Sequence, residues 1–324
     1  MSAKHAQRPR VSIIIPCYNV ARYVAEALDS VLAQTLTDYE TIVVNDGSPD
    51  TEEFERVIAP YQQKIVYIRQ NNRGLAGARN AGLGMARGEY IALLDPDDIW
   101  ESNYLAVQVK ELDAHPSVDV VYSNAIIFGE RMHNREFMSV FPSSGPATFD
   151  RILRRECYVM GSALIRRESI ARAGMFDETL RACEDFDLWL RIARHGCITY
   201  HRQRLVKLRR RTDSLSADDA RMYEHLITVL NKVERTMLLS ASEVAILEEQ
   251  RRRYSAELRL LKGKSALLKG DSDSACGHLK LANEVLRRRK ISCALVLIRI
   301  SPVIGRFAHR LHEGIEQMIN RVQR

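Results

Sequence analysis

Four short, continuously apolar runs in the first hundred residues constrain the fold of this chain most strongly. The runs are rich in β-branched residues, and segments with helical periodicity separate them. Uninterrupted apolar character indicates strands buried on both faces, and alternation with helices indicates a largely parallel sheet. The predicted strands cover residues 11–15, 41–44, 64–68 and 90–94.

The pattern continues beyond the fourth run and then changes. It predicts a strand at 118–122, a loop or irregular hairpin at 129–146, a strand-like run at 157–165, and helices at 20–32, 75–86, 101–114, 150–155, 167–173 and 184–195. A polar stretch at 211–217 ends both periodicities, and the sequence beyond it is helical. We therefore predict a disordered N-terminus at 1–10, an α/β domain at 11–212 and a helical region at 213–324.

Two segments of the helical region, 260–269 and 274–286, flank the turn GDSD. Their small and large apolar residues predict either one tetratricopeptide-style hairpin or an ordinary helix pair. The net charge of +7 is concentrated in this part of the chain, because residues 261–324 contain 13 Lys and Arg against 5 Asp and Glu. Basic runs without a recognised nucleic-acid module are typical of solvated helix faces, so we predict no nucleic-acid partner.

Cysteine spacing and hydropathy indicate a cytoplasmic protein. The six cysteines form no C-x-x-C pair, and no Cys/His cluster has the spacing of a zinc site. The first ten residues are polar, and no window reaches the ~18 apolar residues that span a bilayer. The apolar segment 291–304, followed by Arg306, His309, Arg310 and His312, predicts either packing within the helical region or contact with an anionic membrane surface.

Polar clusters follow three of the predicted strands, at the end of the sheet where α/β proteins bind ligands. The clusters are PCYN, NDGS and DPDD. In the last, Asp95, Asp97 and Asp98 would repel one another, and a divalent cation with bound phosphates would relieve that repulsion. Oxygen ligands favour Mg²⁺ or Mn²⁺. The alternative is a solvated turn that caps the following helix.

Two further groups extend this candidate site. Asp46 is placed to accept a hydrogen bond from a base or ribose, with Tyr18 against the ring, although turn chemistry alone also explains both. Arg73 and Arg79 lie near a predicted helix start, which favours anions such as a diphosphate. Asp185 and Glu184 begin the helix at 184–195, where a carboxylate stays ionised as a general base must be; helix capping is the alternative.

Taken together, these motifs resemble the family 2 glycosyltransferases, inverting enzymes with the GT-A fold, a Rossmann-like and mostly parallel sheet with helices on both faces. The resemblance runs in order over VSIIIPCYN, IVVNDGSPD, NRGLAGARNAGL, ARGEYIALLDPDD, GSALIRR and CEDFDLWLR, and it covers about the first 210 residues. It implies a GT-A domain followed by an all-helical region. The chain lacks the Q-x-x-R-W motif and membrane spans of processive synthases, so a single-addition enzyme is implied.

The resemblance also implies a role for each matching residue. Asp185 would be the catalytic base, and Asp97, with Asp95, would bind the metal. The implied substrate contacts are Pro16, Tyr18 and Asp46 at the nucleoside, Arg79 at the diphosphate, Asp95 at the ribose, Asp98 at the donor or acceptor, Gly161 and Ser162 at the donor sugar, and Trp189 at the acceptor. Glu184, which pairs with Asp185 in the motif, is implied as a further substrate-binding residue.

We therefore predict a metal-dependent glycosyltransferase of cell-surface polysaccharide or glycoconjugate synthesis. A nucleotide-sugar donor, with uridine as the base by resemblance, and a glycan or lipid-linked acceptor are its expected partners. A peripheral position at the inner face of the cell membrane fits a lipid-linked acceptor. A nucleotidyltransferase would carry a Gly-rich basic loop after the first strand, where this chain has PCYNVARY. The remaining alternative is a nucleotide-sugar-binding or interaction protein on the same fold without transferase activity.

Overall fold

The structure, a computed structural model, describes residues 8–130, 134–141, 143 and 145–300. These residues form two compact units. The first extends to Gly129 and resumes at Asn134–Arg210, and the second comprises Glu130 and the chain from Arg211 onward. The predicted disordered segment at 1–10 and the basic residues Arg306, His309, Arg310 and His312 lie wholly or mostly outside the described residues.

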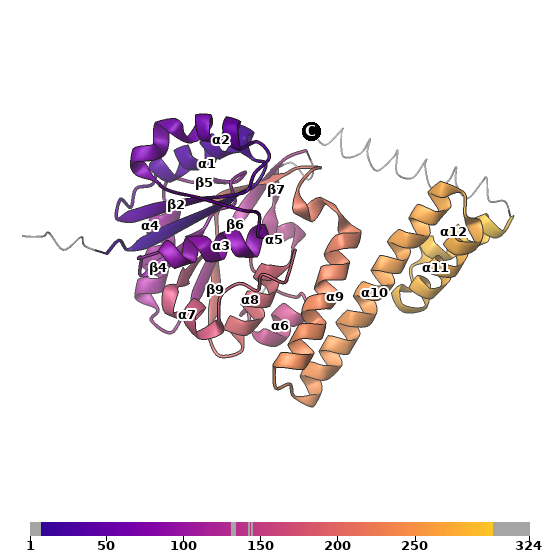
Figure 1. The fold of residues 1–324 in the computed structure, drawn as a ribbon. Coiled ribbons are helices and arrows are strands. Elements are labelled where there is room, and N and C mark those ends of the chain that lie inside the picture. Colours follow the sequence, from indigo (N-terminus) through magenta and orange to yellow (C-terminus); the bar gives the residue numbers. More distant parts are fainter. Residues whose placement is uncertain (1–7, 131–133, 142, 144, 301–324) are drawn as a thin grey trace, which may run out of the picture. The chain divides into compact units, whose positions relative to one another are not determined.

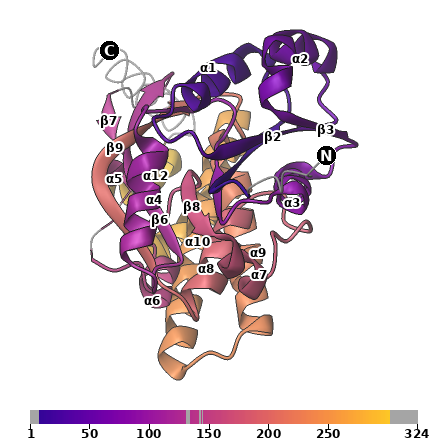
Figure 2. The same cartoon turned by 90° about the vertical axis from the view of Figure 1, so that its left-hand side faces the viewer.

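A mixed β-sheet forms the centre of the first unit (Figures 1 and 2). Its strand order is β3-β2-β1-β4-β8-β6-β9-β5, and β7 pairs with β6. The strands are β1 (Val11–Cys17), β2 (Tyr39–Asp46), β3 (Val66–Gln70), β4 (Tyr90–Leu93), β5 (Ile99–Trp100), β6 (Val120–Gly129), β7 (Arg135–Glu136), β8 (Ala163–Arg166) and β9 (Ile198–Arg210).

Parallel pairing joins the first four strands in the order β3-β2-β1-β4. The apolar run of β1 is buried at every residue, as its sequence predicted. Right-handed crossovers account for the positions of the helices: α1 (Ala21–Leu32) and α2 (Thr51–Ile58) lie on one face, and α3 (Gly74–Met85) lies on the other (Figures 1 and 2).

The other half of the sheet is mixed. β8 runs antiparallel to both β4 and β6, whereas β9 runs parallel to β6 through an irregular register near Ser123 and Asn124. The remaining helices of this unit are the 3₁₀ helix η1 (Ala59–Lys64), α4 (Tyr104–Ala114), α5 (Phe137–Val140), α6 (Phe149–Leu153), α7 (Arg167–Ala173) and α8 (Glu184–Ala193).

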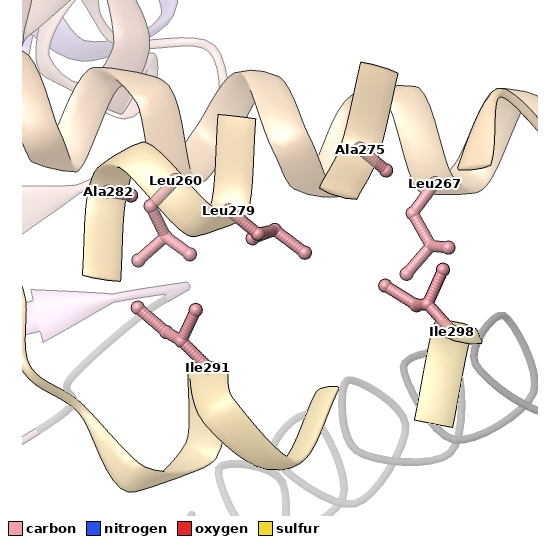
Figure 3. Packing of buried hydrophobic residues seen from close by; sticks show 7 residues of the cluster. All are labelled: Leu260, Leu267, Ala275, Leu279, Ala282, Ile291 and Ile298. Carbon is pink, nitrogen blue, oxygen red and sulfur yellow. The ribbon is translucent and has the colours of Figure 1, made fainter. Parts of the chain in front are cut away.

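Helices make up the second unit. They are the 3₁₀ helix η2 (Leu215–Ala217), α9 (Asp219–Thr236), α10 (Ala241–Lys269), α11 (Ser272–Leu286) and α12 (Arg289–Ile300). Gly270, in the left-handed conformation with φ of 90°, ends α10 and opens the predicted hairpin turn. Figure 3 shows the core that α10, α11 and α12 share, formed by Leu260, Leu267, Ala275, Leu279, Ala282, Ile291 and Ile298.

Several segments differ from the sequence predictions, among them the unpredicted β5 and η1. The run at 157–165 is a strand only from Ala163, because its first part follows an irregular path with a single bridge between Cys157 and Ser143. The charged strand β9 was not predicted. Neither was α2, in which only Phe54 and Ile58 are buried.

Candidate functional site

The ends of β1 and β2 place the predicted nucleoside residues together. The strands pair in parallel register up to Cys17 and Asn45, so the turns that follow them lie side by side. The backbone N–H of Asn19 donates a hydrogen bond to the Ser48 hydroxyl at 2.5 Å and ties the two turns together. Pro16 is buried within β1, whereas the Tyr18 side chain is 52% exposed. Tyr18 thus offers an open aromatic face at this end of the sheet.

Asp46 is buried and holds the segment before α3. Its Oδ1 accepts hydrogen bonds from Gln70 Nε2 at 2.7 Å and from the backbone N–H of Arg73 at 2.8 Å. Gly47 has φ of 66°, and a methyl group there would lie only 2.7 Å from the backbone nitrogen of Asn72. Only glycine permits this close approach. Arg73 itself forms a bidentate ion pair with Glu178, in which Nε donates to Oε2 and Nη2 donates to Oε1.

The three aspartates after β4 differ in their surroundings. Asp98 is buried and accepts the backbone N–H of Arg209 at 2.8 Å, while the backbone carbonyl of Asp97 accepts Arg209 Nε at 2.8 Å. Burial, together with the charges of Asp97 and Asp95, raises the pKa of Asp98 well above its ordinary value. Asp95 and Asp97 are half-buried. Asp98 therefore anchors this turn to β9, and its predicted substrate contact stays a prediction.

Arg79, on α3, is 2% exposed and joins two parts of the site. Its Nη1 donates to Glu184 Oε1 at 2.6 Å, and its Nη2 donates to Asp95 Oδ1 at 3.0 Å. The guanidinium also lies 5.3 Å from the ring centroid of Phe176. The carboxylates of Asp95, Glu184 and Asp185 all favour its charged form and outweigh its burial, so the pKa of Arg79 is raised.

Asp185 faces the same point from the start of α8. Its side chain is half-buried. The helix begins directly after Cys183, whose left-handed φ of 59° directs the chain into α8. Asp185 Oδ1 accepts the backbone N–H of Phe186 at 2.7 Å. Beside it, Glu184 is buried, and this burial raises its pKa to about 7 even though Arg79 acts in the opposite direction.

Gly161 marks the point where these groups meet. A methyl group at this position would lie 3.8 Å from Asp185 Oδ2, 3.9 Å from Arg79 Nη2 and 4.0 Å from Asp95 Oδ2. The side chains come from the turn after β4, from α3 and from α8, so residues far apart in the sequence converge on one half-exposed glycine. A small ligand group at Gly161 would therefore touch two carboxylates and a guanidinium.

Two predicted contact residues are enclosed by the protein. Ser162 is buried, accepts Trp100 Nε1 at 2.8 Å and donates to the Leu93 carbonyl at 3.2 Å. Trp189 is 2% exposed. Contact of either side chain with a sugar or acceptor would require a rearrangement around it, and these roles stay predictions.

Sequence reasoning missed Gln70 and Arg209. Gln70 ends β3 and orients Asp46, a pairing that the parallel register of β2 and β3 would have indicated. Arg209 lies on β9, where the apolar pairs within ITYHRQRLVKLRR were the available signal. Both residues contact parts of the chain that are distant in sequence, and a local motif does not predict such contacts.

The described residues contain neither a cluster of metal-binding side chains nor a helix that could span a membrane. Among residues 8–300, apart from the gaps in the description, no three His, Cys, Asp or Glu side chains form a group able to hold a metal ion. In the same part of the chain, no helix combines the length and apolar character needed to cross a bilayer.

Comparison with known sequences supports a family assignment. Residues 12–174 match the family model described as Glycosyl transferase family 2. An uncharacterised glycosyltransferase of Rickettsia felis is 37% identical over 205 residues, 62% of this chain and 34% of the relative. Another, of Rickettsia prowazekii, is 32% identical over 241 residues, 71% of this chain and 75% of the relative. The chain spans about a third of the length of the first relatives it matches.

Two solved structures share the fold. Staphylococcus aureus TarS 1–349 in complex with UDP-GlcNAc has a TM-score of 0.63 at 18% identity, covering 94% of this chain and 92% of that chain. The mannosyltransferase PcManGT from Pyrobaculum calidifontis, in complex with GDP-Man and Mn²⁺, has a TM-score of 0.60 at 23% identity, covering 97% and 88%. The predicted fold class, a GT-A sheet followed by a helical region, is confirmed.

Proposed function

The chain belongs to glycosyl transferase family 2, and from that premise we propose that it moves a sugar from a nucleotide-diphosphate sugar to an acceptor hydroxyl with inversion. The observation that carries the proposal is the convergence at Gly161 of Asp185 Oδ2 and Asp95 Oδ2, at 3.8 Å and 4.0 Å from a methyl group placed there. We assign the transfer to residues 11–212 and an accessory role to the helical region 213–324.

In the proposed reaction, Asp185 takes the proton of the acceptor hydroxyl while that oxygen bonds to the anomeric carbon. The bond from that carbon to the diphosphate breaks at the same time, and the nucleoside diphosphate leaves with the bonding electron pair. Asp185 lies in the first turn of α8, and its Oδ2 is the oxygen that approaches Gly161, where the acceptor hydroxyl would be deprotonated. Tyr18 and Asp46, with Pro16 beneath them, would hold the nucleoside, and a UDP-sugar is the proposed donor.

The residues after β4 suit a hard divalent cation. Asp95, Asp97 and Asp98 follow one another within four residues after β4, so their carboxylates repel one another, and a cation would relieve that repulsion. Mg²⁺ and Mn²⁺ commonly bind through one or two carboxylates together with phosphate oxygens and water, so a group of three protein ligands is not required. Asp97, with Asp95, would hold the ion. When bound, it would offset the charge that develops on the diphosphate.

A glycan or lipid-linked acceptor, in cell-surface polysaccharide or glycoconjugate synthesis, completes the proposal. Arg287, Arg289 and Lys290 are exposed where α11 leads into α12, which supports peripheral contact with an anionic inner membrane surface. Of the predicted apolar segment at 291–304, residues 301–304 lie outside the described residues. Sedimentation with and without anionic lipid vesicles tests this contact, and a chain that stays in the supernatant contradicts it.

Calorimetric binding of UDP, GDP and dTDP, with and without Mn²⁺ or Mg²⁺, tests the proposed function. We expect metal-dependent binding of one nucleotide, its loss in Asp97→Ala, and its retention in the control Asp38→Ala, which changes an exposed aspartate outside the site. Release of the nucleotide from the matching nucleotide-sugar should follow the same pattern. If no nucleotide binds, an interaction protein on the same fold becomes the better account.

A further inference from the structure

Arg79 has a geometry that differs from that of an open diphosphate-binding residue. Its side chain is 2% exposed, and both terminal nitrogens already donate to carboxylates, Nη1 to Glu184 and Nη2 to Asp95. Moving it toward a phosphate would leave Glu184, which is 3% exposed, without its cation. A buried carboxyl group that loses its hydrogen-bond donor is unfavourable in either protonation state, and most strongly when it is ionised.

The two partners of Arg79 stand next to the two parts of the proposed chemistry. Asp95 begins the cluster that contains the proposed metal ligand Asp97, and Glu184 directly precedes the proposed base Asp185. These carboxylates lie on segments almost ninety residues apart in the sequence, and the described structure connects them through one planar guanidinium. A fork of fixed geometry sets both distance and angle between its partners.

We propose that Arg79 is a positioning residue that holds the donor-side turn after β4 and the base-bearing start of α8 at a fixed separation around Gly161. The inference rests on the proposed function and replaces, within it, the diphosphate contact that the sequence predicted for Arg79. A small error in the placement of a base or donor group lowers the rate strongly, whereas it changes ground-state binding far less.

The test is a cycle of Arg79→Gln, Glu184→Gln and the double variant, with Arg79→Lys as the conservative change. Turnover of the donor is measured together with calorimetric affinity for the metal-bound nucleoside diphosphate, and rates are normalised to the number of nucleotide-binding sites. Arg87→Gln serves as the matched control, because Arg87 pairs with Glu40 where α3 ends.

We expect each single variant to lower kcat by roughly tenfold to a hundredfold and to change nucleotide affinity by less than about threefold. The double variant should be no slower than the slower single variant, because both changes break one bridge. Arg79→Lys should not restore the rate, since an ammonium group cannot reproduce the planar fork. Arg87→Gln should behave as the parent.

Two results would overturn the positioning role: a loss of nucleotide affinity of tenfold or more in Arg79→Gln, or independent, multiplicative losses of kcat in the double variant. The first would make Arg79 a diphosphate ligand after all. Failure of the proposed function is recognised separately, because it appears as absence of turnover in the parent protein before any variant is compared.

Discussion

The helix that carries Asp185 and the helices of the second unit begin in opposite ways. α9, α10 and α11 begin after Asp218, Ser240 and Asp271, and each of these side chains accepts a backbone N–H of the first turn. α8 begins after Cys183, which has a left-handed φ and provides no such bond, and its first turn holds Glu184, Asp185 and Asp187. α1, α3, α4 and α7 of the first unit also lack a side-chain cap bond, so what distinguishes α8 is the left-handed backbone of Cys183 at its start, a strained conformation of the kind found at functional sites.

The largest expected effect is on the rate, and it distinguishes two aspartates that each lie in the first turn of a helix, Asp185 in α8 and Asp219 in α9. Asp185→Asn should lower kcat by on the order of 10²–10⁴-fold, because the amide cannot take a proton from the acceptor. The matched change Asp219→Asn, in the first turn of α9, should leave the rate unchanged and alter stability by only a few tenths of a kcal/mol. Steady-state kinetics and thermal unfolding of both variants measure the contrast. Equal rates in the two variants would remove the distinction and the assignment of Asp185 as the base.

A second contrast concerns pH. The pKa of Glu184 is raised from 4.5 to about 7 by burial, so its contribution to stability is fully present below about pH 4.5 and is lost as the pH rises through 7. At 1.36 kcal/mol per pKa unit, this loss is roughly 3 kcal/mol. Glu184→Gln removes the titration, so the unfolding free energy of the variant relative to the parent should increase between pH 5 and pH 8.

Denaturant unfolding at several pH values measures this difference. Glu178→Gln is the control, because hydrogen bonds from Asn80 and Arg73 lower the pKa of Glu178, and its effect on stability should therefore change with pH in the opposite direction. The stabilisation that this exposed pair provides is small, is present above the ordinary pKa and is lost in acid. A relative stability of Glu184→Gln that does not change with pH would mean that Glu184 stays ionised throughout, held by Arg79.

Two glycines sharpen the comparison further. A methyl group at Gly161 would make only ordinary contacts of 3.8–4.0 Å, so Gly161→Ala should fold normally but lower kcat/KM by roughly tenfold to a hundredfold, because it occupies space proposed for the donor sugar. In α11, a methyl group at Gly277 would meet nothing within 4 Å. Gly277→Ala should therefore raise stability by about 0.5–1 kcal/mol without changing the rate. Full activity of Gly161→Ala would exclude a sugar at that point.

The sequence predicted much of the sheet because continuous apolar runs and their polar ends are local signals. β1, β2 and β4 lie where these runs indicated, and α7 has the predicted bounds. β9 escaped prediction because an exposed, charged face interrupts its apolar residues. Its pairing with β6 is long-range, and no local pattern specifies the partner.

The sequence indicated which strand ends lie together, but not the contacts that their residues make. The strand-end rule brought Asp46, Asp95 and Asp97 to one edge of the sheet. The strand-end rule does not predict that Arg79 donates hydrogen bonds to Asp95 and Glu184, because Glu184 is 105 positions further along the chain. Nor does a motif reveal burial, which gives Ser162 and Asp98 protein partners in the described structure.

The smallest expected effect concerns the helix caps themselves. Ser240 accepts the backbone N–H of Glu243, whose side chain accepts the N–H of Ser240, and Ser240→Ala should cost about 1 kcal/mol of stability with no loss of activity. Cys183→Ser should not produce the corresponding gain, because a capping side chain reaches the first turn from an extended backbone and Cys183 has φ of 59°. Chemical denaturation of both variants measures this. A stabilised Cys183→Ser variant would show that the start of α8 lacks only a capping side chain, and the contrast between α8 and the capped helices would then reflect residue choice rather than a backbone shaped for the site.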